Sequence, residues 1–164
     1  MRLLKDKFVK VNSFSGDIMK KIIKIILIIT CLVSIFMFSS DTGSSSSKKS
    51  DSFIVKVLET IKGKHLNSSL RKKYIDTYVV FVRKSAHFTI YFLLGVFVLS
   101  LLKEYKILSI KLVLISTFLV FLYACSDEFH QLFVVGRSAE IFDILLDSLG
   151  GMVGSCFYYF IRRN

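Results

Sequence analysis

Ionisable side chains recur at helical spacing within apolar parts of this chain, and these are the residues that could do chemistry. Arg83, His87 and Tyr91 are four residues apart, so they line one face of a helix. The complete set of candidate ligand-binding residues is Arg83, His87, Tyr91, Asp127, Glu128, Gln131, Arg137, Asp143 and Asp147. Guanidinium groups bind phosphate or carboxylate through paired hydrogen bonds, and carboxylates or imidazole can transfer protons.

Long apolar segments must position these residues. Hydrophobic residues make up 53% of the 164, which is above the share usual in soluble domains. Four apolar stretches each approach the roughly 20 residues that cross a bilayer as a helix. We therefore predict an all-α integral membrane protein of about four transmembrane helices. The predicted divisions are an N-terminal cytoplasmic tail (1–21), transmembrane helix 1 (22–38), a polar and amphipathic loop (39–82) and a core with transmembrane helices 2–4 (83–161).

The loop over residues 39–82 opens with a serine-rich run that predicts a flexible, hydrated stretch. Farther along, Phe53, Val57 and Ile61 repeat every four residues among charged side chains. This stripe predicts an amphipathic helix. A basic amphipathic helix next to a membrane is expected to lie in the plane of the lipid headgroups.

The candidate residues are expected to share one membrane face. When helices alternate in direction, the start of the second, the end of the third and the start of the fourth lie on the same side. Basic residues near the helix ends favour a multi-pass protein of the cell membrane with both termini in the cytoplasm, so this face points outward. A charged side chain at the bilayer centre costs ~2.5–3.5 kcal/mol, so Asp147 requires a partner or a cavity. Each residue taken singly is better explained as an interfacial anchor or a partner in an ion pair than as a catalytic residue. The set together predicts a functional site.

Composition excludes several other classes of function. The net charge of +11 comes from residues beside apolar segments, where lysine and arginine contact anionic headgroups, so nucleic-acid binding is not expected. The cysteines Cys31, Cys125 and Cys156 lie inside apolar segments and form no disulfide framework or zinc pattern. No cofactor and no metal site are predicted.

Glycines predict close helix packing. Gly150 and Gly154 are four residues apart, a spacing that lets another helix approach closely, and Gly95 is the third residue predicted to serve helix packing. The glycine pair could supply a dimer face, so a homo-oligomer is one expectation.

Three separate motifs resemble the VanZ-like family, which is named for a teicoplanin-resistance protein. They comprise residues 83–88 (Arg-Lys-Ser-Ala-His-Phe), residues 126–131 (Ser-Asp-Glu-Phe-His-Gln) and Gly136-Arg137, followed by Asp143, Leu149-Gly150 and Gly154. The chain departs from the family at Val135, where proline is frequent, and at Asp147, where asparagine is usual. The resemblance implies a multi-pass membrane protein, linked in some members to reduced sensitivity to lipoglycopeptides.

Three functions remain open from the sequence. The leading hypothesis is a module that binds a membrane lipid or lipid-linked envelope precursor through Arg83 and Arg137, lowering teicoplanin sensitivity of a Gram-positive cell. The second is an intramembrane enzyme acting on a lipid-linked substrate, with His87 or Glu128 as general base and carboxylates able to hold Mg²⁺. The third is a small transporter or scaffold that works as an oligomer.

Overall fold

The chain is almost entirely helical in a computed structural model that describes residues 2–62, 67–105 and 107–163. The helices of these ranges are α1 (Arg2–Ser40), α2 (Gly43–Lys62), α3 (Ser68–Leu102), α4 (Ile110–Gln131) and α5 (Ile141–Arg162), and no strand occurs within them. Four segments have the length and composition to cross a membrane: Gly16–Ser40, Ser68–Leu102, Ile110–Gln131 and Ile141–Arg162. The predicted all-α fold with about four transmembrane helices is therefore confirmed.

Several helices extend beyond their predicted limits. Helix α1 continues upstream through the segment predicted as a tail, and α2 begins at Gly43, inside the serine run predicted to be flexible. Helix α3 begins at Ser68, well before residue 83, because Asn67 caps it: the Asn67 side chain accepts a hydrogen bond of 2.9 Å from the Leu70 amide. Most of the predicted loop is thus helical.

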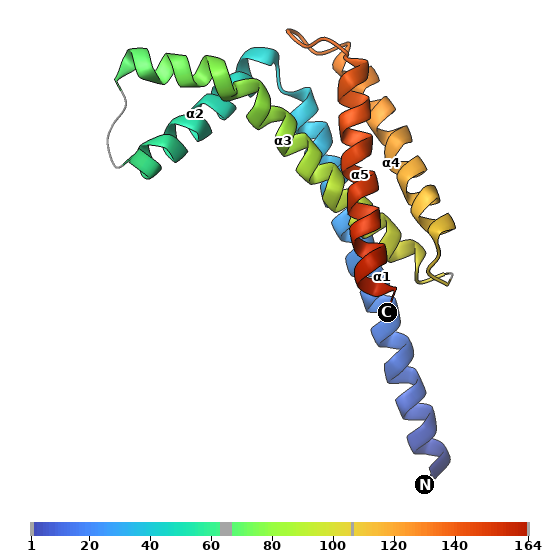
Figure 1. The fold of residues 1–164 in the computed structure, drawn as a ribbon. Helices are drawn as coiled ribbons and strands as arrows, with labels where there is room; N and C mark the ends of the chain where they lie inside the picture. Colours follow the sequence, from blue (N-terminus) through green and yellow to red (C-terminus); the bar gives the residue numbers. More distant parts are fainter. Residues whose placement is uncertain (1, 63–66, 106, 164) are drawn as a thin grey trace.

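The helices form a bundle with a lateral arm (Figure 1). Helices α3 and α5 pack against each other, α4 packs on both, and the second half of α1 contacts α3 and α4. The arm consists of α2 and the first half of α3, which extend sideways at one end of the bundle. Helix α1 enters and α5 leaves at the opposite end (Figure 1).

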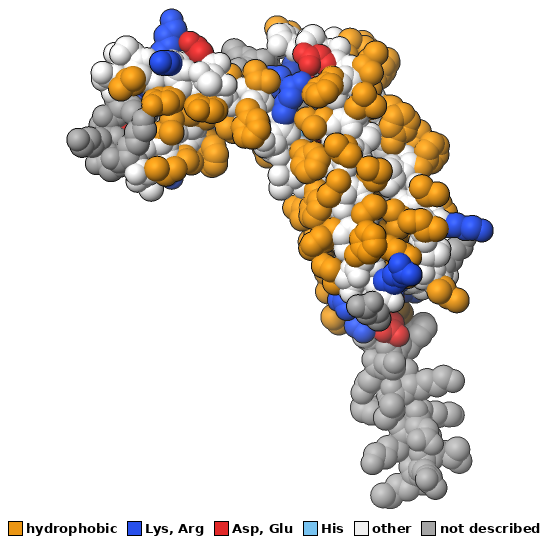
Figure 2. All heavy atoms as spheres, in the orientation of Figure 1, with side chains coloured by type: hydrophobic (Ala, Val, Ile, Leu, Met, Phe, Trp, Pro, Cys, Tyr) orange, Lys and Arg blue, Asp and Glu red, His pale blue; other side chains and the backbone are white. Residues whose placement is uncertain are grey.

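The predicted amphipathic helix is α2. It buries Ile54, while Phe53 and Ile61 are exposed. The bundle itself is coated with apolar side chains, and charged side chains are seen toward its ends (Figure 2). Exposed residues such as Phe118 and Phe160 belong to this coat, which is the surface expected of helices that face lipid rather than water.

Glycines set the close approach of α3 and α5. A Cβ atom added to Gly95 would lie 2.1 Å from the carbonyl oxygen of Gly151, and one added to Gly154 would lie 2.0 Å from the carbonyl oxygen of Phe92. A Cβ atom on Gly150 would likewise meet the Phe88 carbonyl oxygen at 2.7 Å. The glycine pair of α5 therefore packs against α3 of the same chain rather than serving as a dimer face, and a homo-oligomer stays a prediction.

Candidate functional site

Polar residues from all four bundle helices converge where the arm joins the bundle. The C-terminal end of α1, the middle of α3, the end of α4 and the start of α5 meet there, as alternating helix directions require. A small pocket opens at this end. Its lining consists of Arg83, Lys84, His87, Gln131, Arg137, Asp143, Leu146 and Asp147.

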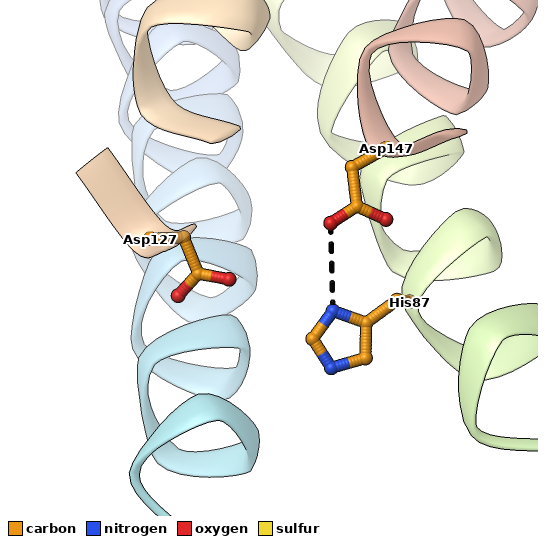
Figure 3. Close-up of side chains that lie close together, drawn as sticks. All are labelled: His87, Asp127 and Asp147. Carbon is orange, nitrogen blue, oxygen red and sulfur yellow. Dashed lines mark ion pairs between the residues drawn. The ribbon is translucent and has the colours of Figure 1, made fainter. Parts of the chain in front are cut away.

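The deepest part of the site brings together three ionisable residues from three helices (Figure 3). His87 of α3 lies beside Asp147 of α5, with His87 Nδ1 3.6 Å from Asp147 Oδ2, and Asp127 of α4 lies across from this pair. Both aspartates are buried, each 4% exposed. One potential ligand atom from each residue lies within 4.8 Å of the others, so these are the described residues best placed to hold a metal ion.

Asp127 is held by hydrogen bonds from two neighbours. Its Oδ2 atom accepts one of 2.8 Å from the Ser39 hydroxyl and one of 3.3 Å from Gln131 Nε2. Ser39 is fully buried at the end of α1. The carboxylate is therefore oriented by α1 as well as by its own helix.

Arg137 stabilises the end of α1. Its Nε atom donates to the Asp41 carbonyl oxygen at 3.1 Å, and Nη2 donates to the Phe38 carbonyl oxygen at 2.7 Å. A third bond of 3.3 Å links Nη1 to Gln131 Oε1. Carbonyls at the end of a helix lack partners within the helix, and an arginine can supply them. Arg137 is thus only partly available to a ligand.

The turn that presents Arg137 requires glycine. Gly136 has φ 76°, a left-handed conformation that side chains with a Cβ atom rarely adopt. Burial, followed by the nearby charge of Arg83, lowers the pKa of the Arg137 guanidinium below its usual value. Two arginines are therefore held close enough to repel each other.

Arg83 and Lys84 differ in their partners although they are neighbours. Lys84 forms an ion pair with Asp143 and another of 3.1 Å with Glu140, which connects α3 to the start of α5. Arg83 is half-buried and has no ion pair or hydrogen bond with any described residue. Arg83 is accordingly the cation of the pocket that is free to meet a ligand.

Glu128 and Tyr91 lie outside the pocket lining. Glu128 Oε1 accepts a hydrogen bond of 2.6 Å from the Glu140 amide, so its carboxylate fixes the connection between α4 and α5. Tyr91 is fully buried one turn below His87, and their ring centroids are 6.5 Å apart.

Ser39, Lys84 and Glu140 are members of the site that the sequence did not single out. Lys84 lies directly beside Arg83, and the acidic residues near the start of the last helix were the available signal for its ion pairs. Ser39 belongs to the polar exit of the first apolar segment. Its contact with Asp127 spans 88 residues of sequence, and no periodicity could have predicted it.

Two mostly apolar grooves adjoin the polar pocket. One shares Arg83 and His87 with the pocket and adds apolar residues such as Phe38 and Phe53. The other shares Lys84 and Leu146 and adds Val80, Phe81 and Phe88. A molecule with a polar head and apolar tails would find both environments side by side.

Comparison with known proteins places these motifs in a family. No curated protein and no solved structure matches the chain significantly. A protein-family model described as VanZ/LLP1 matches residues 24–162, which include α2 to α5 and residues 24–40 of α1. The chain therefore belongs to the VanZ/LLP1 family.

Proposed function

We propose that this multi-pass VanZ/LLP1 protein binds the anionic headgroup of a membrane lipid or lipid-linked envelope precursor in the pocket around Arg83. The observation that carries the proposal is the unpaired Arg83 guanidinium, held near Arg137 in a pocket that adjoins two apolar grooves. The anionic group of the lipid contacts Arg83 at the mouth of the small pocket, and the acyl or prenyl chains follow a groove.

The charges favour an anion as ligand. The charge of Arg83 lowers the pKa of Arg137, although Asp127, Asp41 and Glu128 act in the opposite direction. A phosphate or carboxylate between the two arginines relieves their mutual repulsion. Arg83 contributes bidentate hydrogen bonds, which match the geometry of phosphate oxygens. Arg137 contributes mainly charge, because α1 and Gln131 already use three of its N–H groups.

The surroundings favour a lipid over a free anion. The pocket lies where the amphipathic arm meets the bundle, at the level expected for lipid headgroups. Phe53 of the arm and Phe38 of α1 line the groove that contains Arg83 and His87. A soluble phosphate would use the pocket but gain nothing from the groove.

Lipid binding by the purified chain tests the proposal. Native mass spectrometry would compare dioleoyl phosphatidylglycerol and a polyprenyl phosphate with the zwitterionic lipid dioleoyl phosphatidylcholine. Loss of charge-assisted hydrogen bonds from Arg83 is worth about 1.5–3 kcal/mol, so Arg83→Ala is expected to weaken anionic binding about tenfold to a hundredfold. Arg162→Ala, at the opposite end of α5, is the matched control and should bind as the native chain does.

Two results would speak against a headgroup site. Equal binding of anionic and zwitterionic lipids would remove the role of charge, and equal losses for Arg83→Ala and Arg162→Ala would remove the role of this pocket. Conversion of the bound lipid to a product of different mass would instead support the intramembrane enzyme.

If the pocket faces outward, lipid binding there would affect the sensitivity of the cell to glycopeptides. With both termini in the cytoplasm, the pocket faces the side where teicoplanin meets lipid-linked cell-wall precursors. A sensitive Gram-positive host that expresses the chain is then expected to become less sensitive to teicoplanin. Arg83→Ala at matched membrane levels should restore sensitivity, and Arg162→Ala should not. Unchanged sensitivity with the native chain would contradict this link while leaving the lipid assay to decide on binding.

A further inference from the structure

We propose that His87, Asp127 and Asp147 bind a divalent first-row transition-metal ion such as Zn²⁺ or Mn²⁺. The proposal does not depend on the lipid ligand, because it rests on the mutual geometry of three side chains, two of which also line the pocket. These three residues are contributed by α3, α4 and α5, so an ion would join three helices at one point (Figure 3).

The geometry is close to that of a metal site. Zinc ligands of nitrogen and oxygen lie about 2.0–2.2 Å from the ion, so two ligands in a tetrahedral site are roughly 3.4 Å apart. His87 Nδ1 and Asp147 Oδ2 are 3.6 Å apart, and no pair in the trio of ligand atoms exceeds 4.8 Å. Binding would require the ligand atoms to approach by roughly 1.4 Å at most, which rotation of a carboxylate provides.

The charge of the trio favours a divalent cation. Two buried carboxylates so close together require compensation. A protonated His87 would neutralise one of them, whereas a divalent ion with neutral imidazole neutralises both. The nearest other cations are engaged elsewhere or lie in the pocket above: Lys84 pairs with Asp143, and Arg137 reaches Asp127 only through Gln131.

Tyr91 adds a buried hydroxyl beside the trio. Its hydroxyl is fully buried and has no hydrogen-bond partner among the described residues. It lies close to the carboxylates of Asp127 and Asp147. Leaving such a group unpaired costs about 1–3 kcal/mol. A water molecule bound to the metal as a fourth ligand would supply the partner.

The neighbouring hydrogen bonds suit a metal ligand. Ser39 and Gln131 both donate to Oδ2 of Asp127, which leaves the carboxylate able to turn Oδ1 to the ion. Bonds of this kind commonly orient ligating carboxylates. His87 and Asp147 also line the pocket, so an ion reaches the trio from the membrane surface.

The ligand set selects the type of ion. Imidazole is a common ligand of zinc and other first-row transition metals, whereas Mg²⁺ and Ca²⁺ prefer oxygen ligands alone. One nitrogen and two carboxylates therefore favour Zn²⁺ or Mn²⁺ over Mg²⁺ and Ca²⁺.

Metal binding to the full chain, purified in detergent without a polyhistidine tag, tests the proposal. After removal of metal with a chelator, equilibrium dialysis against Zn²⁺ and elemental analysis should find one ion per chain, retained in excess Mg²⁺. Asp147→Asn and Asp127→Asn should each bind at least tenfold more weakly. Glu140→Gln, which changes an acid of the same bundle end outside the trio, is the matched control and should bind normally. No stoichiometric Zn²⁺ or Mn²⁺ in the native chain, or equal binding by Asp147→Asn and Glu140→Gln, would overturn the site.

Pulsed electron paramagnetic resonance gives a second readout on the folded native chain. Mn²⁺ bound at the trio should show nitrogen coupling from one imidazole. His87→Gln should lose this coupling, whereas His130→Gln, on the same membrane face, should keep it. Bound Mn²⁺ without nitrogen coupling, or coupling that depends on His130, would contradict the proposed ligands. Because no lipid is added, failure of this site and failure of the lipid proposal are distinguishable.

Discussion

Gly95→Ala is expected to loosen the contact between α3 and α5 on which the site depends. The new Cβ atom would lie 2.1 Å from the Gly151 carbonyl oxygen and 2.9 Å from its carbon, whereas ordinary contacts begin near 3.4 Å. Both atoms belong to the backbone of α5, so no side-chain rotation relieves the clash. The helices must therefore move apart by roughly an ångström.

The size of the effect follows from the weaker dispersion attraction between the separated helices. A gap of 0.5–1 Å removes about a quarter to a half of the dispersion energy of each contact, and overpacking of this kind costs about 1–3 kcal/mol. The higher helix propensity of alanine returns at most about 1 kcal/mol. A net loss of about 1–2 kcal/mol is therefore expected, roughly a fivefold to thirtyfold fall in the ratio of folded to unfolded protein.

Unfolding in mixed micelles with increasing sodium dodecyl sulfate, followed by circular dichroism, measures this loss. Gly16→Ala is the matched control, because a Cβ atom on Gly16 meets nothing within 4 Å; it should leave the midpoint unchanged or raise it slightly. The reasoning would be refuted if Gly95→Ala and Gly16→Ala unfolded at the same detergent fraction.

Three further perturbations probe other contacts by the same unfolding assay. Arg137→Gln should destabilise the fold by about 1–3 kcal/mol, because carbonyls at the end of α1 lose their donors; native stability would contradict the capping role. Tyr123→Phe removes the 2.7 Å hydrogen bond to the Leu32 carbonyl oxygen and should cost about 0.5–1.5 kcal/mol, whereas no loss would mean that this bond does not contribute. The Lys24 ion pair lowers the pKa of Glu104 below its usual value of 4.5, so its stabilisation is present above that value and disappears as the pH falls through the folded-state pKa. Because the pair is partly exposed, Glu104→Gln should cost under about 1 kcal/mol at pH 7 and nothing once the native carboxylate is protonated; an equal difference at both pH values would disprove this origin.

The fold could be predicted largely from hydrophobic length, because a bilayer demands about 20 apolar residues per crossing. Hydropathy alone did not predict the early start of α3, since the lysine- and arginine-rich stretch after Ser68 lowers it, although the helical spacing of Leu70, Tyr74, Tyr78 and Val82 indicates a helix there. That stretch packs against α2, where Arg71 pairs with Glu59 at 3.1 Å. The residue at which a helix begins thus depends on contacts between helices, which a hydropathy profile does not describe.

The site was predictable as a set of residues on one face but not as a network. Alternating helix directions were enough to bring His87, Asp127 and Asp147 to the same end of the bundle. Partner choice depends on helix rotation and on side-chain reach, so the pairing of Lys84 rather than Arg83 with Asp143 needed coordinates. The same holds for Arg137, which binds carbonyl groups of α1 in preference to any carboxylate.

Photo-crosslinking of a lipid phosphate tests the central claim of a headgroup pocket most directly. The probe carries a diazirine in the acyl chain close to the phosphate, and mass spectrometry identifies the labelled peptides in the native chain and in Arg83→Ala. The account predicts labelling of the grooves beside the pocket, around Phe53 or Phe88, that excess unlabelled lipid phosphate suppresses and Arg83→Ala largely abolishes. Labelling spread evenly over the apolar coat, or concentrated near Arg162 and unaffected by Arg83→Ala, would contradict it.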